Sequence, residues 1–325
     1  MSHPPRKSTT ARQDTAAPEH EELLVPVPGG ELAVLRWPGA DPGAPVVLAL
    51  HGITANGLTW ARVAHHLAGR VTLVAPDLRG RGRSGKLPGP YGIAAHADDM
   101  ATVVGALDLG RVVLTGHSMG AFTAALTAVR HPDLLSGLLL VDGGVAFPAP
   151  THLAPDELLT AVLGPAMRRL SMTFPDRGAY RAFWQQHPAF AHNWSPWVDA
   201  YIQRDLVGEE PEWRSSCRIE AVRTDGTDQL GEEVSGAVHR LPRPAVLLWA
   251  ERGLMNEPQG LYDEQWLASA GLDPELVRTR LVPGTNHYSI VVGDDGARVV
   301  ARHLLAAAGL AETESRPGTP VARCT

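Results

Sequence analysis

The sequence is poor in cysteine and has no long apolar run. It contains two cysteines in 325 residues, Cys217 and Cys324, which excludes a disulfide framework and favours a reducing compartment. No run of about 18 apolar residues occurs, so no membrane-spanning helix is expected. Residues 1–20 are polar and lack the apolar core of a signal peptide. These absences predict a cytoplasmic protein.

Positive charge is not in excess either. Lys and Arg number 29 against 35 Asp and Glu, which gives a formal net charge of −6. The chain as a whole therefore has no positive field to hold nucleic acid or an anionic membrane. A small molecule is the expected partner, and the sequence leaves the oligomeric state open.

What the sequence does contain is enough apolar material for a sizeable core, at 44% of the residues. Short apolar runs alternate with amphipathic stretches, and this alternation predicts an α/β fold with a mainly parallel sheet covered on both faces. Strands are expected at residues 22–27, 31–37, 46–50, 71–75, 112–114, 138–141, 246–249 and 278–282, and helices at 60–67, 96–107, 119–130, 262–269 and 295–308.

The alternation breaks between residues 146 and 241. This stretch holds four of the eight Trp and four of the five Phe, and Pro-rich joints open and close it. We predict a helical cap over 146–241, inserted into an α/β core made of 21–145 and 242–311. An ordinary run of crossover helices is the alternative. Residues 1–20 and 312–325 are expected to be disordered tails.

One motif carries a candidate nucleophile. Gly116-His117-Ser118-Met119-Gly120 fits G-x-S-x-G and lies between a predicted strand and an Ala-rich predicted helix. A serine on a tight strand-to-helix turn needs small neighbours, which the two glycines provide. The helix N-terminus offers free N–H groups where negative charge would develop. Ser118 is therefore the candidate nucleophile.

A second motif, His51-Gly52-Ile53, directly follows the predicted strand at 46–50. Gly52 allows a sharp turn, after which the Ile53 N–H can point into a site. The N–H groups of Ile53 and Met119 would then form a two-donor oxyanion hole. His51 is expected to be structural, with no role in proton transfer.

These motifs, in this order, resemble those of the α/β-hydrolase superfamily. The loop Asp77–Ser84 and His287 extend the resemblance, which covers roughly residues 22–310. It implies an eight-stranded, mostly parallel sheet, a helical cap after the sixth strand, and a Ser–acid–His triad in that chain order. His287 follows the last predicted strand, where a general base must lie to reach Ser118.

The acid departs from the family pattern. The family's usual acid follows the seventh strand, where this sequence has Ala250-Glu251-Arg252-Gly253, with Gly253 at the expected position. Asp142, at the end of the sixth strand, and Glu251 are the two candidates. We predict Asp142, because the glycines after it would let its carboxylate approach the histidine loop. A plain turn-forming role for Asp142 is the alternative.

The run Gly80–Gly85 also fits the G-x-G-x-x-G pattern of dinucleotide sites. Pro88 and Pro90 follow it and forbid the helix that such a site requires. No cofactor is therefore expected. No metal is expected either, because the histidines outside the motifs show no metal-ligand spacing with nearby Cys or carboxylates. The four cations of this stretch are expected to form a solvated loop: Arg79, Arg81, Arg83 and Lys86.

The predicted function is a serine hydrolase that cleaves a carboxylic ester, lactone or thioester of a largely apolar small molecule through an acyl-enzyme on Ser118. A C–C bond hydrolase, a cofactor-free perhydrolase and a catalytically weak small-molecule-binding protein remain alternatives. Epoxide hydrolase or haloalkane dehalogenase chemistry would need Asp in place of Ser118. We expect Trp184, Trp194 and Trp197 to line part of an apolar pocket, with packing inside the cap as the alternative.

Overall fold

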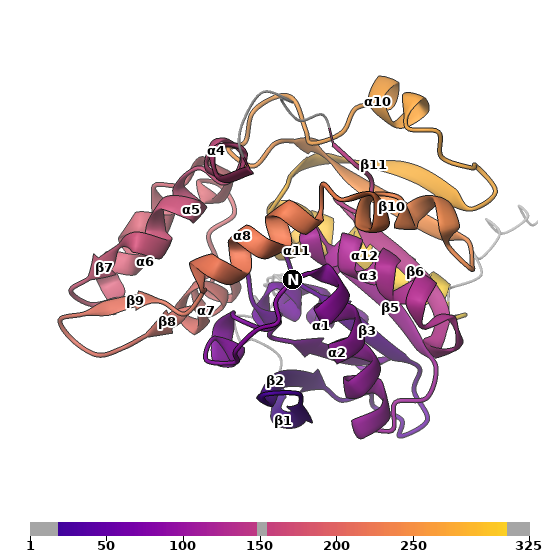
Figure 1. Cartoon of the computed structure of the whole chain (residues 1–325), viewed down its shortest axis with the longest axis horizontal. Helices are drawn as coiled ribbons and strands as arrows, with labels where there is room; N and C mark the ends of the chain where they lie inside the picture. The colour runs from indigo at the N-terminus through magenta and orange to yellow at the C-terminus, as the bar shows by residue number, and fades with distance from the viewer. Residues whose placement is uncertain (1–18, 148–154, 311–325) are drawn as a thin grey trace, which may run out of the picture.

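The centre of the protein is an eight-stranded sheet with helices on both faces (Figure 1). The structure, a computed structural model, describes residues 19–147 and 155–310. The tails predicted at 1–20 and 312–325 fall almost entirely outside these residues.

The strands follow the spatial order β1-β2-β4-β3-β5-β6-β10-β11. Strand β2 runs antiparallel to β1 and β4, and the other neighbouring pairs are parallel. The bounds are β1 Glu21–Val27, β2 Gly30–Trp37, β3 Val46–Leu50, β4 Thr72–Pro76, β5 Val112–His117, β6 Leu135–Val141, β10 Ala245–Arg252 and β11 Val277–Asn286. The predicted mostly parallel eight-stranded sheet is confirmed.

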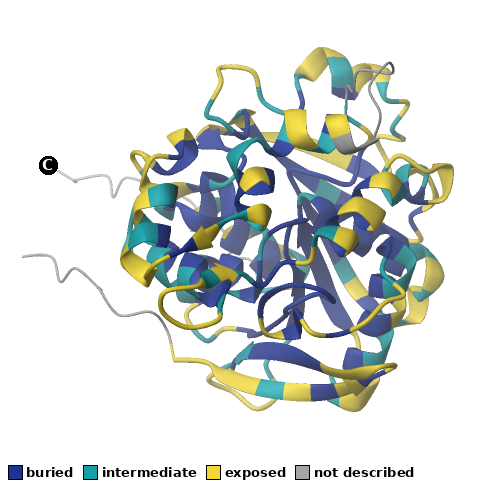
Figure 2. Ribbon diagram, turned by 60° about the vertical axis from the view of Figure 1, so that its left-hand side comes forward, coloured by how far each residue is buried: buried dark blue, intermediate teal, exposed yellow. Residues whose placement is uncertain are grey.

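The burial of each strand explains its sequence pattern. Every residue of β4 and β5 is buried, because helices cover both faces of the sheet there. Strand β1 lies at the edge of the sheet and alternates more exposed with buried positions along its second half. Figure 2 shows this contrast between a buried sheet and an exposed rim.

Two groups of helices cover the sheet. Helix α1 (Ala61–Leu67) packs with α11 (Ser289–Val292) and α12 (Asp294–Ala307), whereas α2 (Ile93–Ala106) packs with α3 (Met119–Arg130). Helix α10, Glu264–Ser269, connects β10 to β11. The predicted helices are confirmed with boundary shifts of up to three residues. Within 19–147 and 155–310, each helix is too short or too polar to span a bilayer.

The segment between β6 and β10 carries short helices and a small antiparallel sheet, and lies to the left in Figure 1. Its helices are α4 Pro155–Leu163, α5 Pro165–Arg168, α6 Arg177–Gln185, α7 Pro196–Arg204, α8 Ile219–Asp228 and α9 Glu232–Ser235, and its strands are β7 Thr173–Phe174, β8 Leu206–Val207 and β9 Trp213–Ser215. This small sheet was not predicted from the sequence, because strands of two or three residues show no alternating pattern. The cap boundaries at 146 and 241 stay a prediction.

The loop after β4 corrects one expectation. Arg83 and Lys86 are exposed as expected, but the side chains of Arg79 and Arg81 are 2% and 0% exposed. Arg79 makes two hydrogen bonds of 2.8 Å to the Asp99 carboxylate of α2. Arg81 lies 2.5 Å from the Asp225 carboxylate of α8. The expectation of a solvated loop was wrong for these two residues, because the carboxylates of Asp99 and Asp225 pair with their buried guanidinium groups.

Candidate active site

Ser118 occupies a strained turn between β5 and α3. Its backbone has φ 56° and ψ −125°, a conformation that residues other than glycine rarely adopt. The two flanking glycines make the turn possible. A Cβ on Gly116 would lie 1.9 Å from the Gly120 oxygen, and a Cβ on Gly120 would lie 2.3 Å from the Leu50 oxygen. The turn thus leaves the Ser118 side chain only half-buried while its neighbours are buried.

His287 directly follows β11 and is joined to Asp142, the residue after β6. His287 Nδ1 donates a hydrogen bond of 2.7 Å to Asp142 Oδ2. An ionised carboxylate can only accept, so this contact places the ring proton on Nδ1 and leaves a lone pair on Nε2. Asp142 is 0% exposed, and His287 is 4% exposed. The structure therefore brings these two predicted site residues into direct contact.

The Asp142 carboxylate is fixed from the neighbouring strand. Its Oδ1 accepts a hydrogen bond of 3.0 Å from the Ala250 N–H, and its own N–H donates to the Leu248 oxygen at 2.7 Å. A Cβ on Gly143 would lie 2.2 Å from the Ser118 oxygen, so the turn after β6 packs directly against the serine turn. Glycine at 143 permits the close approach that the sequence analysis expected.

Glu251, the other candidate acid, lies elsewhere. Its side chain is exposed, and its Oε2 accepts a hydrogen bond of 2.7 Å from the Gly284 N–H. At Gly253, the position of the family's usual acid, the space beside Cα is filled by the Glu257 carboxylate, 2.4 Å from an added Cβ. Among the described contacts, neither position 251 nor position 253 places a carboxylate against His287.

The predicted oxyanion donors flank the serine. Met119 is the first residue of α3, so its N–H has no partner within the helix. Ile53 lies on the loop after β3, which approaches closely, since a Cβ on Gly52 would lie 3.3 Å from Ser118 Cβ. Ile53, Ser118 and His287 together line two cavities.

Comparison with known proteins agrees with the fold that carries these residues. A sequence model of the alpha/beta hydrolase fold matches residues 45–294. The chain belongs to the α/β-hydrolase fold family.

Several proteins are similar to this α/β hydrolase in sequence or in structure. Uncharacterized proteins of Mycobacterium are 42% identical over 100 residues, which is 31% of this chain and 29% of theirs, so the chain spans less than a third of their length. A fluoroacetate dehalogenase of Burkholderia is 27% identical over 84% of this chain and 91% of its own. The crystal structure of E-2-(acetamidomethylene)succinate hydrolase has a TM-score of 0.71 at 22% identity, over 89% of this chain and 98% of that one, which shows the common fold.

Aliphatic side chains form much of the wall around Ser118 in this hydrolase. Leu163 and Leu254 line both cavities. One cavity extends beneath α4 and has these further apolar lining residues: Phe147, Leu158, Leu159, Val162, Leu230 and Leu261. The site is therefore suited to an apolar group next to the reacting carbonyl.

The tryptophans expected in this pocket lie elsewhere. Trp184 is 3% exposed and packs edge-on against Phe190, and Trp197 packs against His65 with ring centroids 5.2 Å apart. Trp194 and Trp197 line a separate hollow on the surface. None of the three lines either of the two cavities described at Ser118. The expectation was wrong, because these rings pack among the elements between β6 and β10 and against α1.

Two residues near the site escaped the sequence analysis. Buried His117 donates from Nε2 to the His287 backbone oxygen at 2.7 Å, and burial holds its pKa well below the usual value. Asn286 accepts from the Tyr288 and Ser289 N–H groups at 3.0 and 2.8 Å, which fixes the turn that carries His287. His117 stands at a variable position of G-x-S-x-G, so the motif gives no signal for it.

Two consecutive carbonyl groups of the Ile53 loop are held by buried side chains. His51 Nδ1 donates to the Gly52 oxygen at 2.8 Å, and His51 Nε2 accepts from the Leu78 N–H at 2.9 Å. Arg81 Nε donates to the Ile53 oxygen at 2.9 Å. These bonds fix the peptide plane that contains the Ile53 N–H and the next peptide plane along the chain. His51 has both ring nitrogens occupied, as a structural residue would.

Proposed function

We propose that this α/β hydrolase is a serine hydrolase that cleaves a carboxylic ester, lactone or thioester of a largely apolar small molecule. Ser118 Oγ attacks the carbonyl carbon while His287 Nε2 takes the Oγ proton. His287 then gives this proton to the leaving alcohol or thiol, and an acyl-enzyme remains on Ser118. Water, deprotonated by His287, releases the acid. The N–H groups of Ile53 and Met119 hold the oxyanion formed in each half-reaction.

The hydrogen bond of 2.7 Å between His287 Nδ1 and Asp142 Oδ2 carries this proposal. In the proposed role, Asp142 keeps the ring in the tautomer that can accept a proton and stabilises the imidazolium that forms. The strained backbone of Ser118, with φ 56°, supports the proposal further, because such strain concentrates at functional sites.

The aliphatic cavity supports the choice of an apolar substrate. Leu158, Leu163 and Leu254 would contact an acyl chain or ring attached to the carbonyl. Each buried methylene contributes about 0.8 kcal/mol, or about a fourfold gain in kcat/KM where the whole chain is buried in the transition state. We expect p-nitrophenyl butanoate and hexanoate to be hydrolysed with a higher kcat/KM than the acetate. A flat or falling series would reject an extended acyl pocket.

A fluorophosphonate probe tests the nucleophile, because only an activated serine reacts with it. The wild-type chain should be labelled and should hydrolyse p-nitrophenyl esters, and Ser118→Ala should lose both properties while keeping its thermal stability. Ser171→Ala, which changes an exposed serine, is the matched control and should behave like the wild type. An unlabelled wild-type chain would overturn the proposal in favour of a binding protein. Labelling without ester turnover would favour C–C bond hydrolysis or perhydrolase chemistry.

A further inference from the structure

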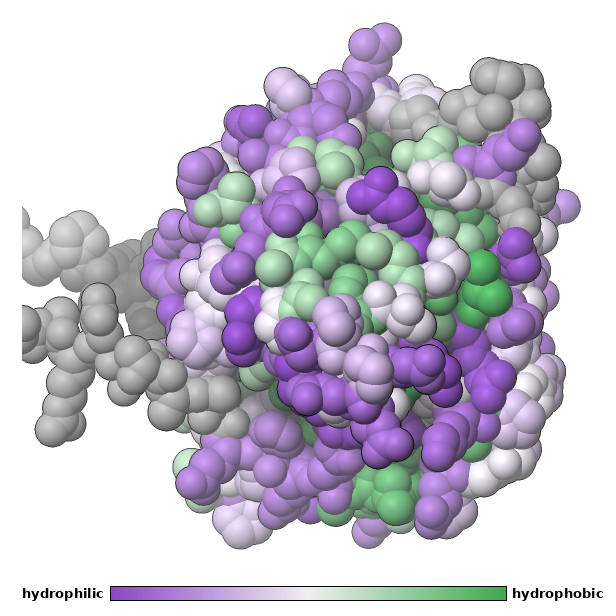
Figure 3. Space-filling model, turned by 90° about the vertical axis from the view of Figure 1, so that its left-hand side faces the viewer, coloured by the Kyte–Doolittle hydropathy of each residue, from purple (hydrophilic) through white to green (hydrophobic). Residues whose placement is uncertain are grey.

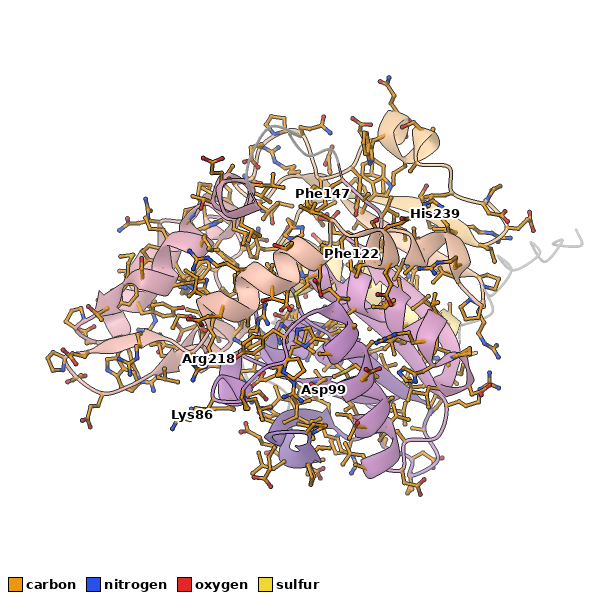
Figure 4. All side chains as sticks on the ribbon, viewed as in Figure 1. Lys86, Asp99, Phe122, Phe147, Arg218 and His239 are labelled. Carbon is orange, nitrogen blue, oxygen red and sulfur yellow. The ribbon has the colours of Figure 1, made fainter. Side chains whose placement is uncertain are left out.

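A second cleft, of about 960 Å³, lies where the loop after β4 meets the small sheet of β7, β8 and β9. One wall is formed by residues 82–86 and the other mainly by residues 206–218. The cleft shares no lining residue with the two cavities at Ser118. Figure 4 shows Lys86 and Arg218, which line it, at this junction.

The charge of this cleft is one-sided. Its lining contains no Asp or Glu but includes five cationic residues: Arg83, Lys86, Arg177, Arg214 and Arg218. All five are exposed residues. In a chain with a formal net charge of −6, five cations around one hollow create a local positive potential that attracts anions.

Three of these cations are free to bind. Within the described residues, the side chains of Arg83, Lys86 and Arg214 have no hydrogen-bond or ion-pair partner. The other two are held in place, since Arg218 Nε donates to the Gly85 oxygen at 2.8 Å and Arg177 stacks over the Trp213 ring at 4.2 Å. The cleft therefore combines fixed and available positive groups.

We propose that this cleft binds a nucleoside polyphosphate, either a free nucleotide or the nucleotide part of a larger carrier. Phosphate groups would bind the free guanidinium and ammonium groups, which form charge-assisted hydrogen bonds with phosphate oxygens. The base would lie on the less polar wall formed by Leu170, Leu206 and Val207. The half-buried ring of Trp213 lies in the same wall.

The surroundings favour a compact ligand over a membrane or a long nucleic acid. The turn between β8 and β9 continues from the cleft residue Gly208 into exposed Glu209, Glu210 and Glu212. These carboxylates would repel a continuous anionic surface laid across this end of the molecule. Figure 3 faces this end and shows hydrophilic residues around a smaller hydrophobic area.

The test is isothermal titration of the full chain with ATP, coenzyme A and pyrophosphate at low and moderate salt. The test variant is the triple substitution Arg83→Ala, Lys86→Ala and Arg214→Ala. The control variant removes the same charge from exposed arginines outside the cleft, Arg278→Ala, Arg280→Ala and Arg302→Ala. Since none of the three test side chains has a described partner, the test variant should keep the wild-type circular dichroism.

We expect saturable, salt-sensitive binding of ATP or coenzyme A to the wild type, a Kd at least tenfold higher in the test variant, and a Kd within twofold of wild type in the control. Tighter binding of coenzyme A than of ATP would assign the cleft to a carrier. No saturable binding to the wild type, or equal loss in both variants, would overturn the proposal. The proposal would also be overturned if the substitutions weakened binding only to phosphatidylserine vesicles or RNA, titrated in the same way, and not to ATP or coenzyme A. Because the readout is binding, it is independent of hydrolysis at Ser118.

Discussion

Arg169 and Thr54 are 115 residues apart in the sequence, and the Arg169 guanidinium donates a hydrogen bond of 2.7 Å to the Thr54 backbone oxygen. Arg169 is 1% exposed, pairs with Asp205 at 3.3 Å, and lies 5.1 Å from the centre of the Trp184 ring. Thr54 follows Ile53, the proposed oxyanion donor. The segment between β6 and β10 therefore holds the backbone next to the reaction site.

We expect Arg169→Met to lower kcat for ester hydrolysis about tenfold with little change in KM. Loss of an oxyanion donor costs about 100- to 1000-fold, and a displaced donor should cost less. Arg168→Met, at the exposed neighbouring residue, should leave kcat unchanged. Both constants come from steady-state kinetics with one ester.

Arg169→Met also removes the ion-pair partner of buried Asp205, which keeps hydrogen bonds from the Tyr180, Ser215 and Ser216 hydroxyls. Loss of the ion pair should lower the free energy of unfolding by about 3 kcal/mol. The double variant Arg169→Met, Asp205→Asn should recover much of that stability but not kcat. Full recovery of kcat in the double variant would show that Arg169 acts through stability alone.

The two candidate acids can be separated by charge-neutral substitutions. Asp142→Asn should lower kcat by about 10⁴-fold, because an amide at this position favours the wrong histidine tautomer. Glu251→Gln should stay within about twofold of wild type, since Glu251 is exposed and binds the Gly284 N–H. Steady-state kinetics on one ester measures both. The reverse result would move the acid to the end of β10.

Two glycine-to-alanine substitutions should have opposite effects on stability. Gly116→Ala would place a Cβ 1.9 Å from the Gly120 oxygen, so we expect a loss of several kcal/mol or failure to fold. Gly105, inside α2, has nothing within 4 Å of an added Cβ. Gly105→Ala should therefore stabilise the protein by about 0.5–1 kcal/mol. Urea unfolding measures both, and a neutral Gly116→Ala would contradict the tight turn.

Stability should fall as the solution is acidified from pH 6.5 to pH 4. Burial lowers the pKa of His51 from 6.5 to about 4, so in this range the unfolded chain binds a proton that the folded chain does not. The free energy of unfolding should then decrease, by about 3 kcal/mol at pH 4 from this residue. Urea unfolding at several pH values measures the slope. His51→Gln should flatten it, and an unchanged slope would mean that other groups cause the loss.

Much of the core could be predicted from the sequence because its signals are local. Continuous apolar runs such as Val46–Leu50 mark strands that are buried on both faces, and β3 has those bounds. The glycines after Asp142 similarly pointed to a close approach, which the contact between Gly143 and Ser118 provides.

Features that depend on distant partners could not be predicted. The sequence around Arg81 looks solvated because its partner, Asp225, lies in α8. The prediction of which residues line the pocket was wrong for the same reason. Aromatic content showed that the segment between β6 and β10 must bury apolar area, but only the packing decides that Leu158 rather than Trp184 faces Ser118.

The placement of Asp142 after β6 has a consequence for the loop that follows β10. Strands β5 and β6 are neighbours, so Ser118 and Asp142 project from adjacent turns, and β10 contributes to the carboxylate only the Ala250 N–H. The loop from 253 to 263 nevertheless supplies Leu254 and Leu261 to the cavity wall. In the proposed mechanism, the loop after β10 therefore contributes to substrate selectivity, whereas the acid that orients His287 comes from the turn after β6. Substitutions at Leu254 and Leu261 can therefore change the preferred substrate without disturbing the proposed catalytic groups, whereas Asn256 of the same loop accepts a hydrogen bond from Asn286 beside His287.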